Sequence, residues 1–241
     1  MNHLAAQLSW PKVKVLAVAD AWALLPVGST EAHGPHLPLN VDVVIAQEVC
    51  RRVGTRLETV EFPAITYSLT EFAAPFAGTV SLSADTARAA LIGVLRGIGQ
   101  AGFRRVCVVN HHLEPAHFKL VHAAASEAQA GTSLRVVVPD HRRKPTGPAL
   151  GDEFMHGGSH AGCYETSLML AAAPHLVNEE VRRTLPSLDV DLPGAIKQGA
   201  TNFLEAGGPE AYFGAPSRAT ADEGQRLFEL IVTATLDAMK D

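Results

Sequence analysis

Three short, mainly apolar runs limit the folds open to this chain more than any other feature. They occupy residues 22–27, 105–109 and 134–138, and a polar segment follows each of them. A run of this length with no apolar–polar alternation is typical of a strand buried on both faces of a sheet. Because helix-like segments separate the runs, we expect an α/β fold in which strands and helices alternate around a mostly parallel sheet.

Helix-capping residues and apolar residues at helical spacing predict where the other elements begin and end. Apolar residues at helical spacing predict a helix over residues 42–57, with Asp42 in its acidic first turn. Ser83 is a suitable N-cap for a second helix, and Pro115 suits the first position of a third. Thr220 and Glu223 form a capping-box pattern for a final helix to about Met239. A further helix over residues 164–173 and a further strand over residues 59–67 are also expected.

Three long stretches are predicted to be loops or loop-rich. They are residues 28–41, 139–159 and 177–212, all rich in glycine, proline or charged residues. Long irregular segments in a compact domain usually serve a function. In sheets of parallel strands, ligands bind outside the carboxyl ends of the strands. The segments that follow the expected strands are therefore the places to look for a site.

Composition narrows the class of protein. Of 241 residues, 47% are hydrophobic and 19% are charged, which is enough apolar material for a core and unlike a disordered chain. We expect one domain over residues 1–241. The net charge of -5 argues against nucleic acid or an anionic membrane as partner, because both require a basic face. A small-molecule partner fits better.

The cysteines and the N-terminus indicate a cytoplasmic protein. Cys50, Cys107 and Cys163 have no metal-type spacing, and we expect buried, reduced thiols. The first ten residues lack the charged and apolar regions of a secretion signal. The early apolar stretch over residues 13–27 is too short to span a bilayer, which takes about 20 apolar residues.

Two segments that each follow an expected buried strand carry side chains that bind metals. Glu31, His33 and Asp42 follow the run 22–27, and His112 and Glu114 lie in the short polar turn after the run 105–109. A mixture of imidazole and carboxylate donors suits Zn, Mn or Fe, whereas Ca prefers oxygen alone. Five donors exceed the needs of one open ion. They suit two divalent ions about 3.5–4 Å apart if one carboxylate bridges them.

Simpler explanations exist for each part of this pattern. A single Glu-x-His pair in a loop is more often solvated than metal-bound, although a second pair at another strand end weakens that explanation. Asp42 taken alone is more often a helix-capping residue, favoured by hydrogen bonding and the helix dipole. The capping and metal-binding roles are compatible.

Four segments resemble the creatininase (creatinine amidohydrolase) family. Residues 26–42 read PVGSTEAHGPHLPLNVD, which is similar to the family signature. Residues 110–114 (NHHLE) resemble its Asn-Gly-His-x-Glu turn, and residues 160–167 (HAGCYETS) resemble its His-Ala-Gly-x-x-Glu-Thr-Ser helix start. Residues 76–82 (FAGTVSL) are similar to a fourth family segment.

The resemblance implies a three-layer α/β/α fold, a binuclear metal centre, hydrolysis of non-peptide amide bonds and a homo-oligomer, often a hexamer. Carried over by position, Glu31 and His33 would bind different ions, Asp42 would bridge them, and His112 and Glu114 would complete the two sites.

His160 and Glu165 match the family positions that orient substrate and move protons. Two ions would acidify a water between them and polarise the carbonyl group, and Glu165 would carry its proton to the leaving nitrogen. His160 would hold the substrate or stabilise the oxyanion. Taken without the family pattern, Glu165 near the start of a helix also has a plain capping and dipole explanation.

The chain also departs from the family pattern. His111 is unusual, and we expect it at the surface more than beside the metal ligands. Creatininases use tryptophans in the loop before the His-Ala-Gly segment, but here Trp10 and Trp22 are the only tryptophans and both lie far upstream. The corresponding loop carries Phe154, Met155 and His156 instead. Creatinine is therefore a poor guess for the substrate.

Other polar residues fit ordinary structural roles. The run 141–144 (HRRK) is predicted to be a solvated charged face, with the alternative that Arg142 or Arg143, or Lys144, binds a carboxylate or phosphate of the substrate. We expect surface or packing positions for His117 and His122, and a small buried residue at Cys163.

The sequence thus predicts a metal-dependent amidohydrolase that cleaves a C–N bond of a small cyclic amide or formamide, with two Zn or Mn ions, or Fe. Two alternatives remain open. One is a catalytically silent metal-binding or scaffold protein of the same fold, and the other is a hydrolase of a C–C bond in an oxidised cyclitol.

Overall fold

The computed structural model describes residues 1–157 and 159–240. Gly158, in the expected irregular segment 139–159, and Asp241, at the end of the expected domain, lie outside the described residues. The sheet has the strand order β1-β3-β2-β4-β5, and every neighbouring pair is parallel. The strands are Asn2–Leu4 (β1), Trp22–Val27 (β2), Thr59–Glu61 (β3), Arg105–Asn110 (β4) and Arg135–Val137 (β5).

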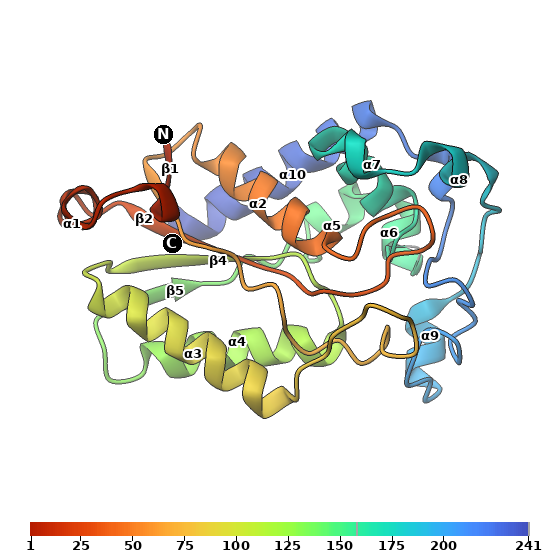
Figure 1. The fold of residues 1–241 in the computed structure, drawn as a ribbon, viewed down its shortest axis with the longest axis horizontal. Coiled ribbons are helices and arrows are strands. Elements are labelled where there is room, and N and C mark those ends of the chain that lie inside the picture. The colour runs from red at the N-terminus through yellow and green to blue at the C-terminus, as the bar shows by residue number, and fades with distance from the viewer. Residues whose placement is uncertain (158, 241) are drawn as a thin grey trace.

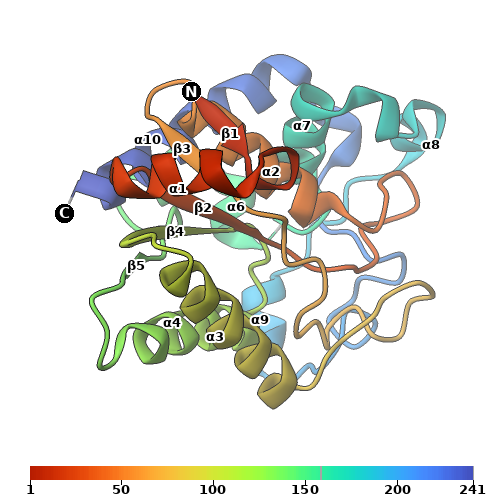
Figure 2. The same cartoon turned by 60° about the vertical axis from the view of Figure 1, so that its left-hand side comes forward.

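Helices cover both faces of this sheet. The helices α2 (Val41–Val53), α7 (Cys163–Ala172) and α10 (Ala221–Lys240) lie on one face, and α3 (Ala84–Gln100) and α4 (Pro115–Gln129) lie on the other (Figure 1). Figure 2 shows α3 and α4 side by side below the strands. The expected three-layer α/β/α architecture is confirmed.

The central strand β2 shows why an unbroken apolar run was needed. All of its residues are buried. Trp22 and Leu24 pack into the core beneath α2, α7 and α10, whereas Ala23 and Leu25 pack into the core above α3 and α4. Because successive side chains of a strand point to opposite faces, a strand with two covered faces must be apolar at consecutive positions.

Two expected elements end earlier than predicted, for local reasons. The strand predicted over residues 59–67 ends at Glu61, and Pro63 two residues later has no N–H to donate to a ladder. The helix predicted over residues 42–57 ends at Val53, and Gly54 after it packs so closely on β1 that an added Cβ would lie 2.2 Å from the Asn2 Cβ. Ser83 caps α3 as expected, accepting a hydrogen bond from the Thr86 N–H.

The expected capping box of the final helix is only half formed. The Thr220 hydroxyl accepts the Glu223 N–H at 3.2 Å, but the Glu223 carboxylate pairs with Arg226 instead of returning to Thr220. The Thr220 N–H donates to Ser167 on α7. At Gly224 an added Cβ would lie 1.9 Å from the Ser167 carbonyl oxygen, so glycine is required for the close packing of α10 on α7.

Short helices occupy the segments that were predicted to be irregular. Residues 139–157 contain α5 (Thr146–Ala149) and α6 (Asp152–His156), and residues 177–212 contain α8 (Glu179–Thr184) and α9 (Leu192–Lys197). The strand β1 and the helix α1 (Trp10–Val18) near the N-terminus were not predicted. Three short 3₁₀ turns, Ala5–Gln7, Pro174–Leu176 and Pro216–Arg218, complete the description.

The thiols are free, and one lies differently from the prediction. Cys50 and Cys107 are buried, but Cys163, the first residue of α7, is only partly buried. Among the described residues, no helix combines the length and the apolar character that a membrane crossing requires.

Candidate metal centre

Strand pairing brings the two ligand-bearing loops together. β2 and β4 are parallel neighbours, and Val27 at the end of β2 lies opposite Asn110 at the end of β4. The His111 N–H continues the ladder by donating to the Val27 carbonyl at 3.1 Å. Both loops therefore leave the same edge of the sheet side by side.

Gly28 allows the start of α2 to approach the end of β2. A Cβ at Gly28 would lie 2.7 Å from the Val43 nitrogen and 2.8 Å from the Asp42 Cβ. The absence of a side chain there lets the first turn of α2 press against the strand end. Asp42, in that first turn, is thereby held over the loops.

The two carboxylate oxygens of Asp42 face two different imidazoles. Oδ1 lies 3.4 Å from Nε2 of His33, and Oδ2 lies 3.1 Å from Nδ1 of His112. All three side chains are almost completely buried. This divergent arrangement is the one that a carboxylate shared between two cations requires.

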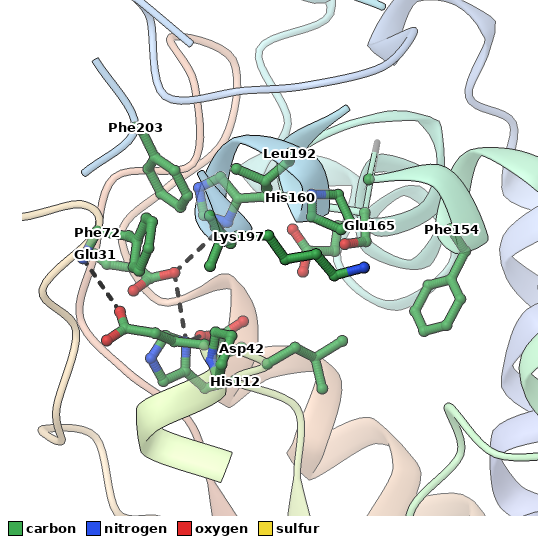
Figure 3. Close-up of a pocket in the computed structure, with 17 residues that line it drawn as sticks. Glu31, Asp42, Phe72, His112, Phe154, His160, Glu165, Leu192, Lys197 and Phe203 are labelled. Carbon is green, nitrogen blue, oxygen red and sulfur yellow. Dashed lines mark hydrogen bonds and ion pairs between the residues drawn. The ribbon is translucent and has the colours of Figure 1, made fainter. Parts of the chain in front are cut away.

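Glu31 faces three imidazoles through a single oxygen. Its Oε1 lies 3.5 Å from Nδ1 of His112, 3.6 Å from Nδ1 of His160 and 3.8 Å from Nε2 of His33. Figure 3 shows Glu31 between His112 and His160, with dashed lines to both. The side chain of Glu165, in the first turn of α7, reaches the same place, with Oε2 at 3.6 Å from Nε2 of His33.

Backbone carbonyl groups fix the orientation of the three imidazoles. His33 Nδ1 donates to the Glu31 carbonyl at 3.1 Å, and His112 Nε2 donates to the Leu69 carbonyl at 2.9 Å. His160 Nε2 donates to the Ala32 carbonyl at 3.0 Å. Because a carbonyl only accepts, each of these nitrogens carries the proton, and the other ring nitrogen faces the carboxylates. Histidine ligands of metals are held in this way.

Hydroxyl groups support the carboxylates from behind. The Ser29 hydroxyl donates to Oδ2 of Asp42 at 2.7 Å, and the Thr70 hydroxyl donates to Oε2 of Glu31. Sequence reasoning identified neither residue as part of the site. Ser29 lies within the segment that resembles the family signature, whereas Thr70 is brought in from the stretch after β3 and carries no local signal.

Charge is concentrated in this buried cluster. Burial alone would lower the pKa of His33 and of His112, but the surrounding carboxylates, Asp42 and Glu31 among them, outweigh it and raise each pKa to about 10. The same imidazoles overcome the effect of burial on Asp42 and hold its pKa well below the ordinary value. Burial raises the pKa of Glu165 to about 8.

The donor set fits transition-metal cations. Three groups of side chains have ligand atoms close enough to share one ion: Glu31, Asp42 and His112; His33, Asp42 and Glu165; and Glu31, His33 and His160. Nε2 of His33 is buried and has no hydrogen-bond partner among the described residues. A buried cluster of imidazole nitrogens and carboxylate oxygens is suited to Zn or Mn.

Four of the five expected ligands belong to these groups, and Glu114 does not. Its Oε2 accepts the Phe72 N–H at 3.2 Å, and its Oε1 is buried without a partner among the described residues. Burial raises the pKa of Glu114 to about 7. Glu114 lines the same pocket as the cluster and stands beside it.

The cluster forms the floor of a cavity of about 390 Å³. Glu31, Asp42, His112, His160 and Glu165 lie at its base. The remaining wall is mainly apolar and includes Phe72, Leu113, Phe154, Leu192, Ile196 and Phe203. Lys197 also lines the cavity (Figure 3). Sequence reasoning missed the residues contributed by α9 and by the segment after it, because no pattern links them to the signature loops.

The candidate arginines lie elsewhere. Arg142 and Arg143 both bind the Asp140 carboxylate, and Arg142 also stacks over the ring of Phe118. The described lining of the cavity includes neither arginine, nor Lys144. Within the described chain the cation at the cavity wall is Lys197.

The expected surface position of His111 is wrong. His111 is 1% exposed and stacks between His141 and Tyr164, because the ladder contact to Val27 draws it inward from the strand end. His117 packs behind the site and bonds both Ser68 and Asn110. His122 is partly buried against Phe118.

These features define an α/β protein with a candidate two-metal site at the carboxyl ends of its strands. The family model described as Creatininase: Creatinine amidohydrolase matches residues 6–239. A creatinine amidohydrolase of Pseudomonas putida is 28% identical to the chain, over 98% of this chain and 95% of that protein. A mycofactocin precursor peptide peptidase of Mycobacterium ulcerans (strain Agy99) is 30% identical, over 93% of this chain and 82% of that protein.

Solved structures agree with the sequence comparisons. A structure described as Creatininase Mn has a TM-score of 0.80 and 27% identity, and covers 100% of this chain and 98% of its own. A mutant creatininase described as Zn-Zn type has a TM-score of 0.78 and 26% identity, with 98% and 96% covered. The chain belongs to the creatininase family. It is a hydrolase of the carbon–nitrogen class that this family comprises, and its metal dependence follows from the shared fold.

Proposed function

We propose that the chain hydrolyses a non-peptide C–N bond of a small cyclic amide or formamide, using two Zn or Mn ions per chain. The observation that carries this proposal is the split of the Asp42 carboxylate between His33 and His112. We also propose a single domain, a cytoplasmic location and a homo-oligomeric state, such as a hexamer. These last three rest on sequence arguments and on the family resemblance.

Geometry and the family resemblance together suggest the ligand sets. Glu31, Asp42 and His112, whose ligand atoms lie close together, would hold one ion, and His33 and Asp42 would hold the other. Glu114 is assigned to the second ion from the resemblance alone, because its side chain belongs to none of the three groups. When bound, such ions acidify a water molecule and polarise a carbonyl oxygen. The protein's part is to hold these five donors in place through the Ser29, Thr70 and backbone hydrogen bonds already described, including the Phe72 N–H bond to Glu114.

Glu165 is proposed to move the proton. Its Oε2 is held at 2.6 Å by the Ala161 N–H, and burial places its pKa near 8, so the side chain can both accept and release a proton near neutral pH. It would take the proton of the attacking water and deliver it to the departing nitrogen. General acid–base catalysis of this kind is typically worth about 10²–10⁴-fold.

His160 is proposed to hold the substrate. Burial keeps the pKa of His160 well below its ordinary value, so the ring is neutral. Its Nε2 proton is committed to the Ala32 carbonyl, which leaves Nδ1 as an acceptor facing the cavity floor. The ring is therefore suited to accept an N–H of the substrate, more than to donate to an oxyanion.

The apolar wall bears on the alternative substrates. An oxidised cyclitol would place several hydroxyl groups against Phe72, Phe154 and Phe203, which offer no hydrogen bonds, and buried unpaired polar groups are costly. A peptide end is a better second candidate, because a peptidase is among the relatives and an apolar wall accepts apolar side chains.

Metal analysis followed by a substrate panel tests the proposal. The purified protein would be stripped with a chelator, reloaded with Zn or Mn, and assayed on cyclic amides, formamides and short peptides. We expect about two ions per chain and turnover that disappears with the metal. Bound metal without turnover across the panel would instead support a scaffold protein. Failure to take up either metal would refute both metal-based functions.

A further inference from the structure

The cavity above the candidate metal centre has two chemically distinct parts. Its floor is made of the buried carboxylates and imidazoles, and most of its wall is hydrocarbon. Phe203 is central to that wall, with its ring 4.2 Å from the ring of His160 and 5.8 Å from the ring of Phe72. An aromatic or large apolar group next to the reacting amide would pack against this pair of rings.

Lys197 is the exception in this wall. It is the last residue of α9, and it is the only lysine or arginine among the described residues that line the cavity. In Figure 3 its side chain crosses the cavity towards the region where Phe154 lies. An ammonium group in that position adds a positive charge to a wall that is otherwise mainly apolar.

Lys197 is exposed to solvent, and no partner among the described residues holds its side chain. Basic residues are favoured in the last turn of a helix, and that accounts for a lysine at the end of α9. It does not account for the direction of the side chain. Within residues 1–157 and 159–240, the ammonium group makes neither a hydrogen bond nor an ion pair, although Glu31, Asp42, Glu114 and Glu165 line the same cavity.

We propose that Lys197 selects substrates that carry a carboxylate beside the scissile amide, with an apolar or aromatic group on the other side. This inference rests on the proposed amidohydrolase function and specifies its substrate class. A single ammonium group suits a singly charged carboxylate. A phosphate dianion is usually bound by arginine forks and several backbone N–H groups, and the described wall of the cavity supplies no arginine.

The reaction on such a substrate is an ordinary hydrolysis. Water adds across the C–N bond, so the carbonyl carbon gains an oxygen and becomes a carboxylic acid. The nitrogen gains a proton and leaves as an amine that keeps the second carboxylate. No oxidant or reductant is involved. Lys197 takes no part in bond making, and its role is to fix the position of the substrate.

Matched probes separate the charge from the rest of the substrate. N-benzoylglycine has an aromatic group, a secondary amide and a carboxylate, and N-benzoylglycinamide differs only in having a neutral amide in place of the carboxylate. Binding of both to Zn-loaded protein would be measured by calorimetry, so that the result does not depend on turnover. The variants are Lys197→Gln, Lys197→Arg and, as a control, Lys119→Gln, which changes an exposed lysine of α4 away from the cavity.

We expect the unchanged protein to bind the carboxylate about tenfold more tightly than the neutral amide, the factor that one charge-assisted hydrogen bond contributes. Lys197→Gln should abolish this preference with metal content unchanged, Lys197→Arg should keep most of it, and Lys119→Gln should keep all of it. Equal binding of the two probes to the unchanged protein, or binding of neither at millimolar concentration, would overturn the inference. Loss of metal binding would instead count against the proposed function, so the two failures are distinguishable.

Discussion

Asp42 joins the local structure to the chemistry at the scale of single residues. As an acid in the first turn of α2, it is favoured by the positive end of the helix dipole. Its two oxygens also face His33 and His112, which come from different loops. Sequence alone supports both roles, and in the fold the first-turn position of Asp42 is compatible with both.

Two carboxylates compete for the remaining role at the second ion, and substitution separates them. Glu114 lines the cavity beside the cluster, whereas Glu165 lies 3.6 Å from His33. We expect Glu114→Gln to lose about one ion per chain and most activity, because an amide is a poor metal ligand. Glu165→Gln should retain both ions and lose about 10²–10⁴-fold in kcat. Metal analysis of both variants checks this, and the reverse pattern would exchange the two assignments.

Metal uptake should release protons. In the metal-free protein the carboxylates raise the pKa of His33 and His112 to about 10, so both rings are protonated at neutral pH. Each must lose its proton to bind a cation. We therefore expect about one proton released per ion, and affinity that falls about tenfold for each unit decrease in pH below 10. Calorimetry in buffers of different ionisation enthalpy measures the number of protons released per ion. A metal affinity that does not change with pH would contradict the prediction.

Tyr164 provides a test of buried polar atoms. Its hydroxyl is buried and has no hydrogen-bond partner among the described residues, while its ring stacks on His111. Removing an unsatisfied buried group costs nothing and can stabilise a protein by about 1–3 kcal/mol. Tyr164→Phe should therefore leave the free energy of unfolding unchanged or raised, as measured by urea denaturation. A loss of more than about 1 kcal/mol would show that the hydroxyl is paired in solution.

At the scale of elements, the site depends on how closely α2 approaches β2. Gly28→Ala would place a methyl group 2.7 Å from the Val43 nitrogen, so the first turn of α2 must move. We expect a loss of about 1–3 kcal/mol in unfolding free energy, together with weaker metal binding as Asp42 shifts. Gly93→Ala in α3 is the control, because nothing lies within 4 Å of the added carbon and it should stabilise the helix by about 1 kcal/mol. Urea denaturation and metal titration measure both effects. The same unfolding free energy and metal affinity for the two variants would contradict the prediction.

Elements covered on both faces could be predicted from the sequence more easily than short elements or elements at the sheet edge. β2 and β4 were recognisable because both of their faces are covered, so the positions inside the sheet, such as residues 106–109 of β4, are apolar. α8 and α9 were not, because they are six residues long and too short to show a helical period. β1 has three residues and, among the described strands, pairs with β3 alone at the sheet edge, which leaves little trace in the sequence.

At the scale of the molecule, residues far apart in the sequence complete the site. Glu31, His33, Asp42 and His112 could be predicted because each lies at a strand end or in a loop between apolar runs. Their partners Thr70, Phe203 and Lys197 could not, because they come from segments far from the ligand-bearing loops in sequence and only the folding of the chain brings them to the site. The substrate-binding wall was therefore the least predictable part of the site.

The most direct measurement of the central claim is anomalous scattering from crystals loaded with Mn or Zn. The account predicts two peaks about 3.5–4 Å apart, one between Asp42 and His112 and the other between Asp42 and His33. A single peak, or peaks that do not contact Asp42, would contradict it.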